Sequence, residues 1–367
     1  MRRSLILLFI MTLQSCAHSE IKIIKPKRES PVPQKNKTNK ITQKARIQKT
    51  APKRTSRFLR KIHGHKMRFW VKYFTQRDRQ RFKRYLKNGA RYKKMVQSIF
   101  KSYGLPTELY YVGLIESGYY LESRSHASAK GPWQFMKETG QNYGLTINRY
   151  IDERESIFKS THAAAKYMRH LYHMFGSWEL ALSAYNAGEN GIKRRIKRGR
   201  SKNYYTLSRL RLLPKETRHY IPKVLAVMHI LKNPKRYGLR VPRPHKNLLT
   251  KVKTFKIKPR IKVNRLITKL GVSRASFYNL NNDLKTKTLP VTRKGFTLFV
   301  PRYSKINRTK KYLSYLQSIR PKHHVVKRGD YLIKIARRYG VSLRALKNLN
   351  DLKRGRIYPG QKLLVSN

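Results

Sequence analysis

The sequence predicts an α+β protein in which an all-α block is followed by small βααβ units. Two observations support this class. From Phe58 to about Tyr237, aromatic and aliphatic residues recur at helical spacing with no competing strand-like alternation. Beyond the Pro/Arg/His stretch 241–245, which reads as a linker, short strand-like runs enclose pairs of short helical runs. At 367 residues, the chain is long enough for one or two compact domains with linkers.

The N-terminal segment predicts export. Arg2 and Arg3 precede the apolar run 5–11, which is too short to span a bilayer and has the form of a signal peptide, assigned here to residues 1–15. It leads to Cys16, the single cysteine, so no intramolecular disulfide can form. Two interpretations remain: an ordinary signal peptide with an incidental cysteine, or a segment that resembles a bacterial lipobox. Residues 16–60 are polar and rich in Lys, Pro, Gln and Thr, which predicts a disordered basic tether.

The helical block, residues 61–240, contains one carboxyl group in an unusual setting. Pro106 is suited to the first position of a helix, and the following run 109–115 carries no charge. Leu109, Val112 and Glu116 share one face, so the Glu116 carboxylate projects from an apolar stripe. Such surroundings raise the pKa of a carboxyl group and suit a general acid. The alternative is a structural Glu that ends a buried helix in a cap or salt bridge.

Three further helices are predicted in this block. One begins at residues 160–161 and carries apolar residues on one face as far as Phe175. A second spans Trp178 to Ala187, and a third spans 221–231 between Pro222 and Pro234.

The C-terminal residues 322–367 predict a single βααβ unit. The expected elements are a strand at 324–326, a helix from Leu332 capped by Gly329 and Asp330, a second helix from Ser342 to Asn350, and a strand at 362–365 after the turn 358–360. Residues 250–301 repeat this order loosely, with expected strands at 255–257 and 296–300. An internal repeat of this kind suggests tandem binding modules.

Charge alone points to polyanions. The chain has 87 Lys and Arg against 16 Asp and Glu, a formal net charge of +71, and nucleic acid is the first candidate for such a chain. The export signal argues against a specific nucleic-acid partner and favours anionic envelope polymers. Most of the acidic residues lie between Glu108 and Glu216, which suggests that this domain requires carboxylates.

Several motifs of the helical block occur together. They are Leu114-Ile115-Glu116-Ser117, Ser125, Gly131-Pro132-Trp133-Gln134-Phe135-Met136, Ala184-Tyr185-Asn186-Ala187-Gly188 and Glu216-Thr217-Arg218-His219-Tyr220. In order and spacing they resemble the membrane-bound lytic transglycosylases of the D type, whose catalytic domain is lysozyme-like. The βααβ unit at 322–367 resembles a LysM module, and residues 250–301 look like a degenerate copy. Ala127-Ser128-Ala129 and Pro132 depart from the usual family pattern. By the resemblance these residues belong to the loop that forms the cleft wall, so the departure does not affect the acid Glu116.

The resemblance implies cleavage of the MurNAc-β-1,4-GlcNAc bond of peptidoglycan without water. Glu116 would first protonate the glycosidic oxygen and then, as a carboxylate, take the proton of the muramoyl C6 hydroxyl, giving a 1,6-anhydromuramoyl end. One carboxylate suffices in this scheme, whereas most glycosidases use two.

The resemblance also implies the substrate-binding residues Ser117, Ser125, Gln134, Tyr185, Asn186 and Glu216. Ser125 and Gln134 would bind the sugar amide or the reacting centre, and Phe135 and Met136 would line the cleft. The Tyr185 hydroxyl would lie against the Glu116 carboxyl, and Asn186 would fix its loop. The alternatives are a helix-end aromatic for Tyr185 and a helix cap for Gln134. Glu216 either binds the peptide stem or pairs with Arg218, and the structural pairing is slightly favoured.

For the LysM module, the expected glycan-binding residues flank a groove: Gly329, Asp330, Tyr331, Ile357, Tyr358 and Pro359. Asp330 could also simply cap its helix. By family analogy, lipidation of Cys16 with Ala17 after it would direct the protein to the outer membrane, facing the periplasm. No cofactor motif occurs, and the twelve His form no metal-ligand pattern. The alternatives to a transglycosylase are a non-catalytic peptidoglycan-binding lipoprotein, a hydrolytic lysozyme and a general polyanion-binding protein.

Overall fold

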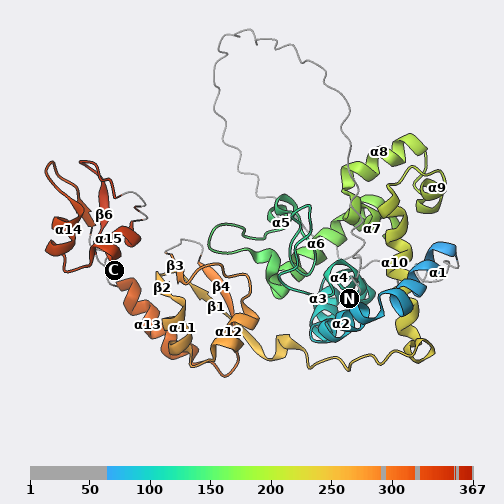
Figure 1. The fold of residues 1–367 in the computed structure, drawn as a ribbon, viewed down its shortest axis with the longest axis horizontal. Helices are drawn as coiled ribbons and strands as arrows, with labels where there is room; N and C mark the ends of the chain where they lie inside the picture. The colour runs from blue at the N-terminus through green and yellow to red at the C-terminus, as the bar shows by residue number, and fades with distance from the viewer. Residues whose placement is uncertain (1–63, 291–294, 319–322, 351, 353–354, 366–367) are drawn as a thin grey trace, which may run out of the picture. The chain divides into compact units, whose positions relative to one another are not determined.

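The computed structural model describes residues 64–290, 295–318, 323–350, 352 and 355–365 (Figure 1). The predicted signal peptide, the lipidation site Cys16 and the whole of the predicted tether therefore lie outside the described residues. The helical block begins with α1 (His65–Lys72), a π-helical turn (Tyr73–Arg77), α2 (Arg79–Ala90), α3 (Lys93–Ser102) and α4 (Tyr110–Ser117). It continues with α5 (Lys137–Asn142), α6 (Ile157–Phe175), α7 (Trp178–Ala187), α8 (Glu189–Gly199), α9 (Tyr204–Arg209) and α10 (Lys215–Lys232).

Helix α4 lies at the centre of this block. It packs against α2, α3 and α10, and all its residues except Tyr111 and Glu116 are buried. The surrounding core is aromatic: Phe82, Phe100 and Trp133 are almost completely buried. The indole N–H of Trp133 donates to Thr161 Oγ1 at 3.0 Å, so its burial leaves no unpaired donor. A short apolar helix inside such a core is held rigidly, which fixes the residue at its end.

Two helix boundaries differ from the sequence-based expectation. Helix α6 begins at Ile157 rather than at 160–161, because Ser156 is the N-cap and accepts from the Lys159 backbone N–H. Helix α10 begins at Lys215 and runs through Pro222, which was expected to bound it. Proline removes the hydrogen bond to the carbonyl four residues earlier. The Tyr204 hydroxyl donates to that carbonyl, Arg218 O, at 3.1 Å, which explains why the helix can continue.

Pro106 is also shifted from its expected position. It precedes a 3₁₀ turn (Thr107–Leu109), and α4 begins only at Tyr110.

Residues 241–247 have no regular structure, as expected of a linker. The next unit contains β1 (Val252–Ile257), β2 (Ile261–Lys262), α11 (Val263–Leu270), α12 (Arg274–Leu280), β3 (Thr288–Leu289) and β4 (Phe296–Pro301). Strand β1 pairs antiparallel with β4, and β2 with β3. After α13 (Ile306–Ser318), the last unit contains β5 (His323–Val325), α14 (Leu332–Arg338), α15 (Leu343–Leu349) and β6 (Lys362–Leu364), with β5 antiparallel to β6. We call residues 252–301 the first module and residues 323–365 the second module.

The two modules share a specific asparagine arrangement. In the first module, Asn281 follows α12; its amide donates to Phe277 O and Phe299 O, and its Oδ1 accepts from Phe299 N, each at 2.8 Å. In the second module, Asn350 follows α15 and makes the same three bonds to Leu346 O, Leu364 O and Leu364 N. In both modules one side chain therefore ties the end of the second helix to the last strand. The repeat seen in the sequence is a repeat in structure.

The cap expected at Asp330 is not present. The N-cap of α14 is Tyr331, without a side-chain bond. The Asp330 carboxylate instead accepts from Lys327 N at 2.9 Å and contacts His324 Nε2 at 2.6 Å, which orders the loop before the helix. The predicted fold class is confirmed: an all-α block precedes the βααβ units, and strand pairing among the described residues of the helical block is limited to isolated bridges.

Candidate active site

Glu116 lies on the last turn of α4. It is partly exposed, while its neighbours Ile115 and Ser117 are buried. The helix ends at once because Gly118 adopts a left-handed conformation with φ 61°. A Cβ at Gly118 would lie 2.2 Å from the Tyr85 ring, so only glycine fits there. Glu116 is thus fixed at the edge of the core as a partly exposed residue.

The surroundings of Glu116 raise the pKa of its carboxyl group, as the sequence predicted. Burial is the largest cause, and Glu216 adds to the rise. The Tyr220 hydroxyl donates to Glu116 Oε1, and this bond and the Lys223 ammonium favour the ionised form and partly offset the rise. A carboxyl group with a raised pKa and two groups that stabilise its anion can give up a proton and recover it.

The tyrosine that contacts Glu116 is not the expected one. The Tyr185 hydroxyl donates to Trp133 O at 2.7 Å, so the expectation that it lies against the Glu116 carboxyl was wrong. Tyr220 has this position. Glu216, Tyr220 and Lys223 are spaced i, i+4 and i+7 on α10, and all three act electrostatically on Glu116. The spacing places the three side chains on one face of α10, but only the packing of α10 against α4 shows that this face meets Glu116.

A loop between α4 and α5 carries two more expected site residues. Gln134 has φ 49°, and its amide donates to Gly131 O at 2.8 Å and Ser123 O at 3.2 Å. It is not a helix cap, because α5 begins three residues later. Ser125 Oγ accepts from Ala129 N at 3.1 Å, and the residue is partly exposed. Gln134 and Ser125 therefore belong to one internally bonded loop, which we call the wall loop (residues 123–136).

Two other expected contact residues point inward. Ser117 is 3% exposed, and its hydroxyl donates to Pro132 O at 2.9 Å. It links α4 to the wall loop and is not available to a substrate. Phe135 is 2% exposed and belongs to the core, so it does not line a cleft. Met136 is 47% exposed and remains available for contact.

Asn186 and Glu216 are joined across α7 and α10. The Asn186 amide donates to Glu216 Oε1 at 3.1 Å, and Thr217 Oγ1 donates to Asn186 Oδ1 at 2.8 Å. Asn186 is thus a residue of helix α7 that links it to α10, and it does not fix a loop carrying Tyr185, as had been expected. The favoured pairing of Glu216 with Arg218 was wrong, because among the described residues Arg218 makes no ion pair and its Nε is buried without a partner. Glu216 instead keeps an exposed carboxylate close enough to influence Glu116.

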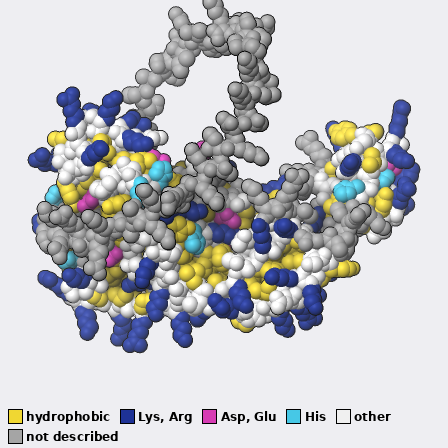
Figure 2. Space-filling view, turned by 180° about the vertical axis from the view of Figure 1, so that it is seen from behind, with side chains coloured by type: hydrophobic (Ala, Val, Ile, Leu, Met, Phe, Trp, Pro, Cys, Tyr) yellow, Lys and Arg dark blue, Asp and Glu magenta, His cyan; other side chains and the backbone are white. Residues whose placement is uncertain are grey.

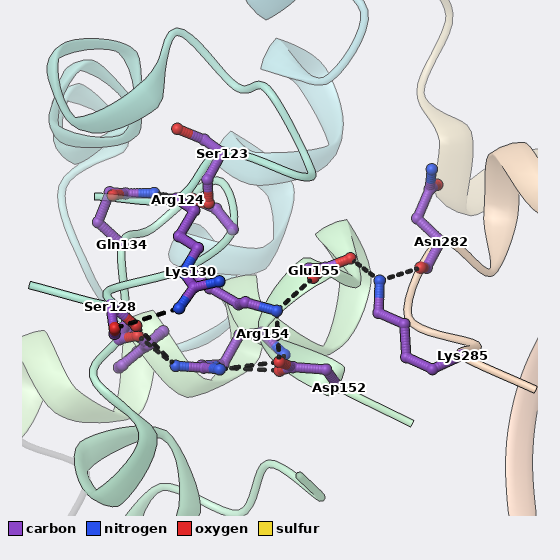
Figure 3. Close-up of polar contacts among 12 residues, drawn as sticks. Ser123, Arg124, Ser128, Lys130, Gln134, Asp152, Arg154, Glu155, Asn282 and Lys285 are labelled. Carbon is purple, nitrogen blue, oxygen red and sulfur yellow. Dashed lines mark hydrogen bonds and ion pairs between the residues drawn. The ribbon is translucent and has the colours of Figure 1, made fainter. Parts of the chain in front are cut away.

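The wall loop is held from behind by a charged segment that the sequence reasoning missed (Figure 3). Arg154 is 6% exposed and forms a two-point ion pair with Asp152, with bonds of 2.8 and 2.9 Å. The other guanidinium nitrogen donates to Ser128 O and Phe135 O at 3.2 and 3.3 Å. The concentration of charge at 152–155 was visible in the sequence, but its partners lie about twenty residues away in the chain.

The described residues contain neither a candidate metal site nor a candidate membrane span. No group of three His, Cys, Asp or Glu within them could hold a metal ion. None of the helices in the described part of the chain is both long and apolar enough to cross a membrane.

Comparison with known families agrees with the motifs. Residues 96–208 match the model of the transglycosylase SLT domain, and residues 324–366 match that of the LysM domain. The SLT match thus lies in the helical block, and the LysM match falls on the second module. The SLT match includes Glu116, the wall loop and α7.

Among curated proteins, the chain is similar to the membrane-bound lytic murein transglycosylase D of Escherichia coli K12. The two are 32% identical over 282 residues, which cover 72% of this chain and 61% of the relative. The chain thus spans about three fifths of that relative's length. It is also 36% identical over 93 residues to a putative tributyltin chloride resistance protein of Alteromonas sp. strain M-1, covering 25% of this chain and 45% of that protein. A solved structure, the 70 kDa soluble lytic transglycosylase of Escherichia coli, matches with 21% identity and a TM-score of 0.31 over 35% of this chain and 22% of that one.

Proposed function

We propose that the protein is a peptidoglycan lytic transglycosylase that cleaves the MurNAc-β-1,4-GlcNAc bond and leaves 1,6-anhydromuramoyl ends. One observation carries the proposal: Glu116 is a partly exposed residue at the edge of a core, whose carboxyl group has a raised pKa and a tyrosine hydroxyl that stabilises its anion. The SLT domain match and the similarity to a lytic murein transglycosylase support the same reaction.

In the proposed reaction, Glu116 protonates the glycosidic oxygen while it is neutral. The resulting carboxylate accepts a hydrogen bond from Tyr220 and is attracted by Lys223. It then removes the proton of the C6 hydroxyl of the same muramoyl residue, which attacks C1 and closes the anhydro ring. Ser125 and Gln134 on the wall loop and the exposed Met136 would contact the sugars. Glu216 would contact the peptide stem or order the site through Asn186.

A hydrolytic lysozyme is the second candidate, because Glu216 is a second carboxylate that influences Glu116. A retaining or inverting hydrolase needs such a partner. Mass spectrometry of digested sacculi separates the two reactions, because anhydro ends are lighter by one water than reducing ends. Reducing MurNAc as the main product would contradict the transglycosylase proposal.

Glu116→Gln tests the acid itself. The substitution keeps the shape of the side chain but cannot donate and recover a proton, so activity should fall at least ~100-fold while the chain stays folded. Turnover near that of the wild type would show that another residue is the acid. Loss of activity with unchanged sacculus binding would also separate an enzyme from a purely peptidoglycan-binding protein.

We further propose that the second module binds glycan strands. Tyr331 and Tyr358 are 59% and 64% exposed, and both belong to the loops expected to flank a groove together with Gly329, Ile357 and Pro359. The LysM match supports this role. Asp330 would contribute by ordering its loop, since its carboxylate is engaged with Lys327 N and His324.

The proposed location is the cell envelope, with lipidated Cys16 as an outer-membrane anchor facing the periplasm. Support comes from the sequence of the N-terminus and from the similarity to a protein named as membrane-bound. Many Lys and Arg side chains project from the face shown in Figure 2, while Asp and Glu are few there. Such a surface would attract anionic envelope polymers. Labelling with a radioactive fatty acid in cells, with and without Cys16→Ala, tests the anchor.

A further inference from the structure

The first module is joined to the helical block by backbone pairing. Asp152 N donates to Asp283 O, and Lys285 N donates to Tyr150 O, both at 2.8 Å. Between these bonds, Ile151 and Leu284 form an antiparallel bridge. The segment 150–152 therefore acts as a short strand for the module segment 283–285. This is the same chain segment that carries the Asp152–Arg154 pair behind the wall loop.

Apolar contacts reinforce this junction. Ile151 is 1% exposed and packs in the hydrophobic core of the first module, although it belongs to the helical block. Phe158 of α6 stacks on Phe299 of β4, with ring centroids 4.1 Å apart and an interplanar angle of 17°. The first module is thus packed against the block by its core residues and not merely tethered to it by the linker.

Buried charges make the junction specific. The Asp283 side chain is 1% exposed, and its carboxylate forms an ion pair with Lys159 of α6 at 2.7 Å. The Lys285 ammonium pairs with Glu155, whose side chain is 4% exposed. If the module shifted, Asp283 and Glu155 would lose partners in a region with little water, which is strongly unfavourable.

The charges continue from the junction to the wall loop (Figure 3). Glu155 Oε1 lies 3.3 Å from the Lys130 ammonium, which is also 3.4 Å from Asp152. Lys130 is a residue of the wall loop, and its backbone pairs with Phe135 in both directions. Lys285 of the module and Lys130 of the loop therefore share one buried carboxylate.

The backbone of the loop also approaches this segment closely. A Cβ at Gly131 would lie 1.9 Å from Arg154 O, so the loop can rest here only with glycine at that position. Gln134 then donates to the Gly131 carbonyl. The position of the Gln134 amide thus depends on where the 152–155 segment lies.

We propose that Asp283 and Lys285 of the first module are positioning residues for the active site, which hold the wall loop and its Gln134 and Ser125 in place through the 152–155 segment. The first module is then a fixed part of the catalytic unit. The expected effect on activity rests on the proposed function, whereas the positioning of the wall loop by Asp283 and Lys285 does not.

The test uses the full chain with the double variant Asp283→Asn/Lys285→Met. Lys285→Arg is the conservative variant, and Lys287→Met is the matched control, because Lys287 is an exposed lysine of the same segment. Hydrogen exchange of peptides from residues 124–135 is measured well below the melting temperature. We expect at least ~10-fold faster exchange in the double variant, and no change in the control or in peptides from α7.

Activity on sacculi provides the second readout. The double variant should lower kcat about tenfold, because a small displacement of a group that contacts the substrate weakens catalysis. KM should stay nearly unchanged, because the second module still binds the glycan separately. Lys285→Arg should stay within about twofold of the wild type, since it keeps the charge. Unchanged exchange in 124–135, or exchange raised equally throughout the chain, would overturn the proposal. An inactive wild type would instead count against the proposed function, and the exchange result would still decide the positioning role.

Discussion

Removing one hydroxyl group tests the electrostatic account of Glu116 most directly. Tyr220→Phe keeps the buried ring but deletes the hydrogen bond that lowers the pKa of the Glu116 carboxyl. A hydrogen bond to a charged group contributes about 1.5–3 kcal/mol. If that stabilisation is needed when the carboxylate forms in the reaction, kcat should fall about 10- to 100-fold.

The same change predicts a shift in pH dependence. Burial continues to favour neutral Glu116 in the variant, so the pKa of its carboxyl group rises further. The free enzyme needs the protonated acid, and kcat/KM therefore declines as pH rises through this pKa. In Tyr220→Phe the decline should move to higher pH.

The assay is solubilisation of sacculi followed over a range of pH, with stability measured in parallel. Tyr119→Phe is the matched control, because it also deletes a buried hydroxyl, which donates to Tyr110 O at 2.7 Å, without touching Glu116. The control should lose some stability and keep the wild-type pH profile. If Tyr220→Phe has the same kcat and the same alkaline midpoint as the wild type, the assignment of Tyr220 is refuted.

Three further predictions concern the support of the site. Asp152→Asn should destabilise the chain by about 3–5 kcal/mol at pH 7, because it leaves buried Arg154 unpaired. Burial raises the pKa of the Asp152 carboxyl, but pairing with Arg154 outweighs this effect and lowers it. The pair therefore stabilises the fold fully above the ordinary pKa of aspartate. The difference in unfolding free energy between wild type and variant should shrink as pH falls through the lowered pKa of Asp152. Gly131→Ala should destabilise the fold far more than Gly144→Ala, since both glycines have positive φ but a Cβ at Gly144 meets nothing within 4 Å; equal melting temperatures would contradict this. Removing residues 323–367 should leave turnover of soluble glycan unchanged and weaken sacculus pull-down at high salt, where the net charge is screened; equal pull-down would exclude glycan binding by the second module.

Much of the architecture could be predicted from the sequence alone. The helical period before residue 240 and the βααβ order after it were sufficient for the fold class, because both patterns are local and reflect which side of an element is buried. Helix α7 was predicted correctly for the same reason, and the helix expected from Ser342 is α15, with Ser342 as its N-cap. The raised pKa of Glu116 also followed from an uncharged run around a single carboxylate.

Contacts between distant segments could not be predicted in this way. Whether Tyr185 or Tyr220 reaches Glu116 depends on how α7 and α10 pack against α4, and both tyrosines fit the motif equally well. In the sequence, Pro222 indicates a helix boundary. In the structure the helix continues, because the Tyr204 hydroxyl of α9 donates to the Arg218 carbonyl that proline leaves without a donor. Ser117 and Phe135 read as cleft residues, yet close packing turns their side chains into the core.

The sequence by itself determined the element types, the apolar surroundings that raise the pKa of Glu116, and the presence of a repeat. Only the tertiary structure decided which residues of the helical block pair with the charged side chains of the first module. Asp283 and Lys285 are unremarkable among the residues of a very basic chain, and their partners lie more than a hundred residues earlier. An ion pair acquires its specificity from burial, and burial is a property of the assembled fold that no local pattern encodes.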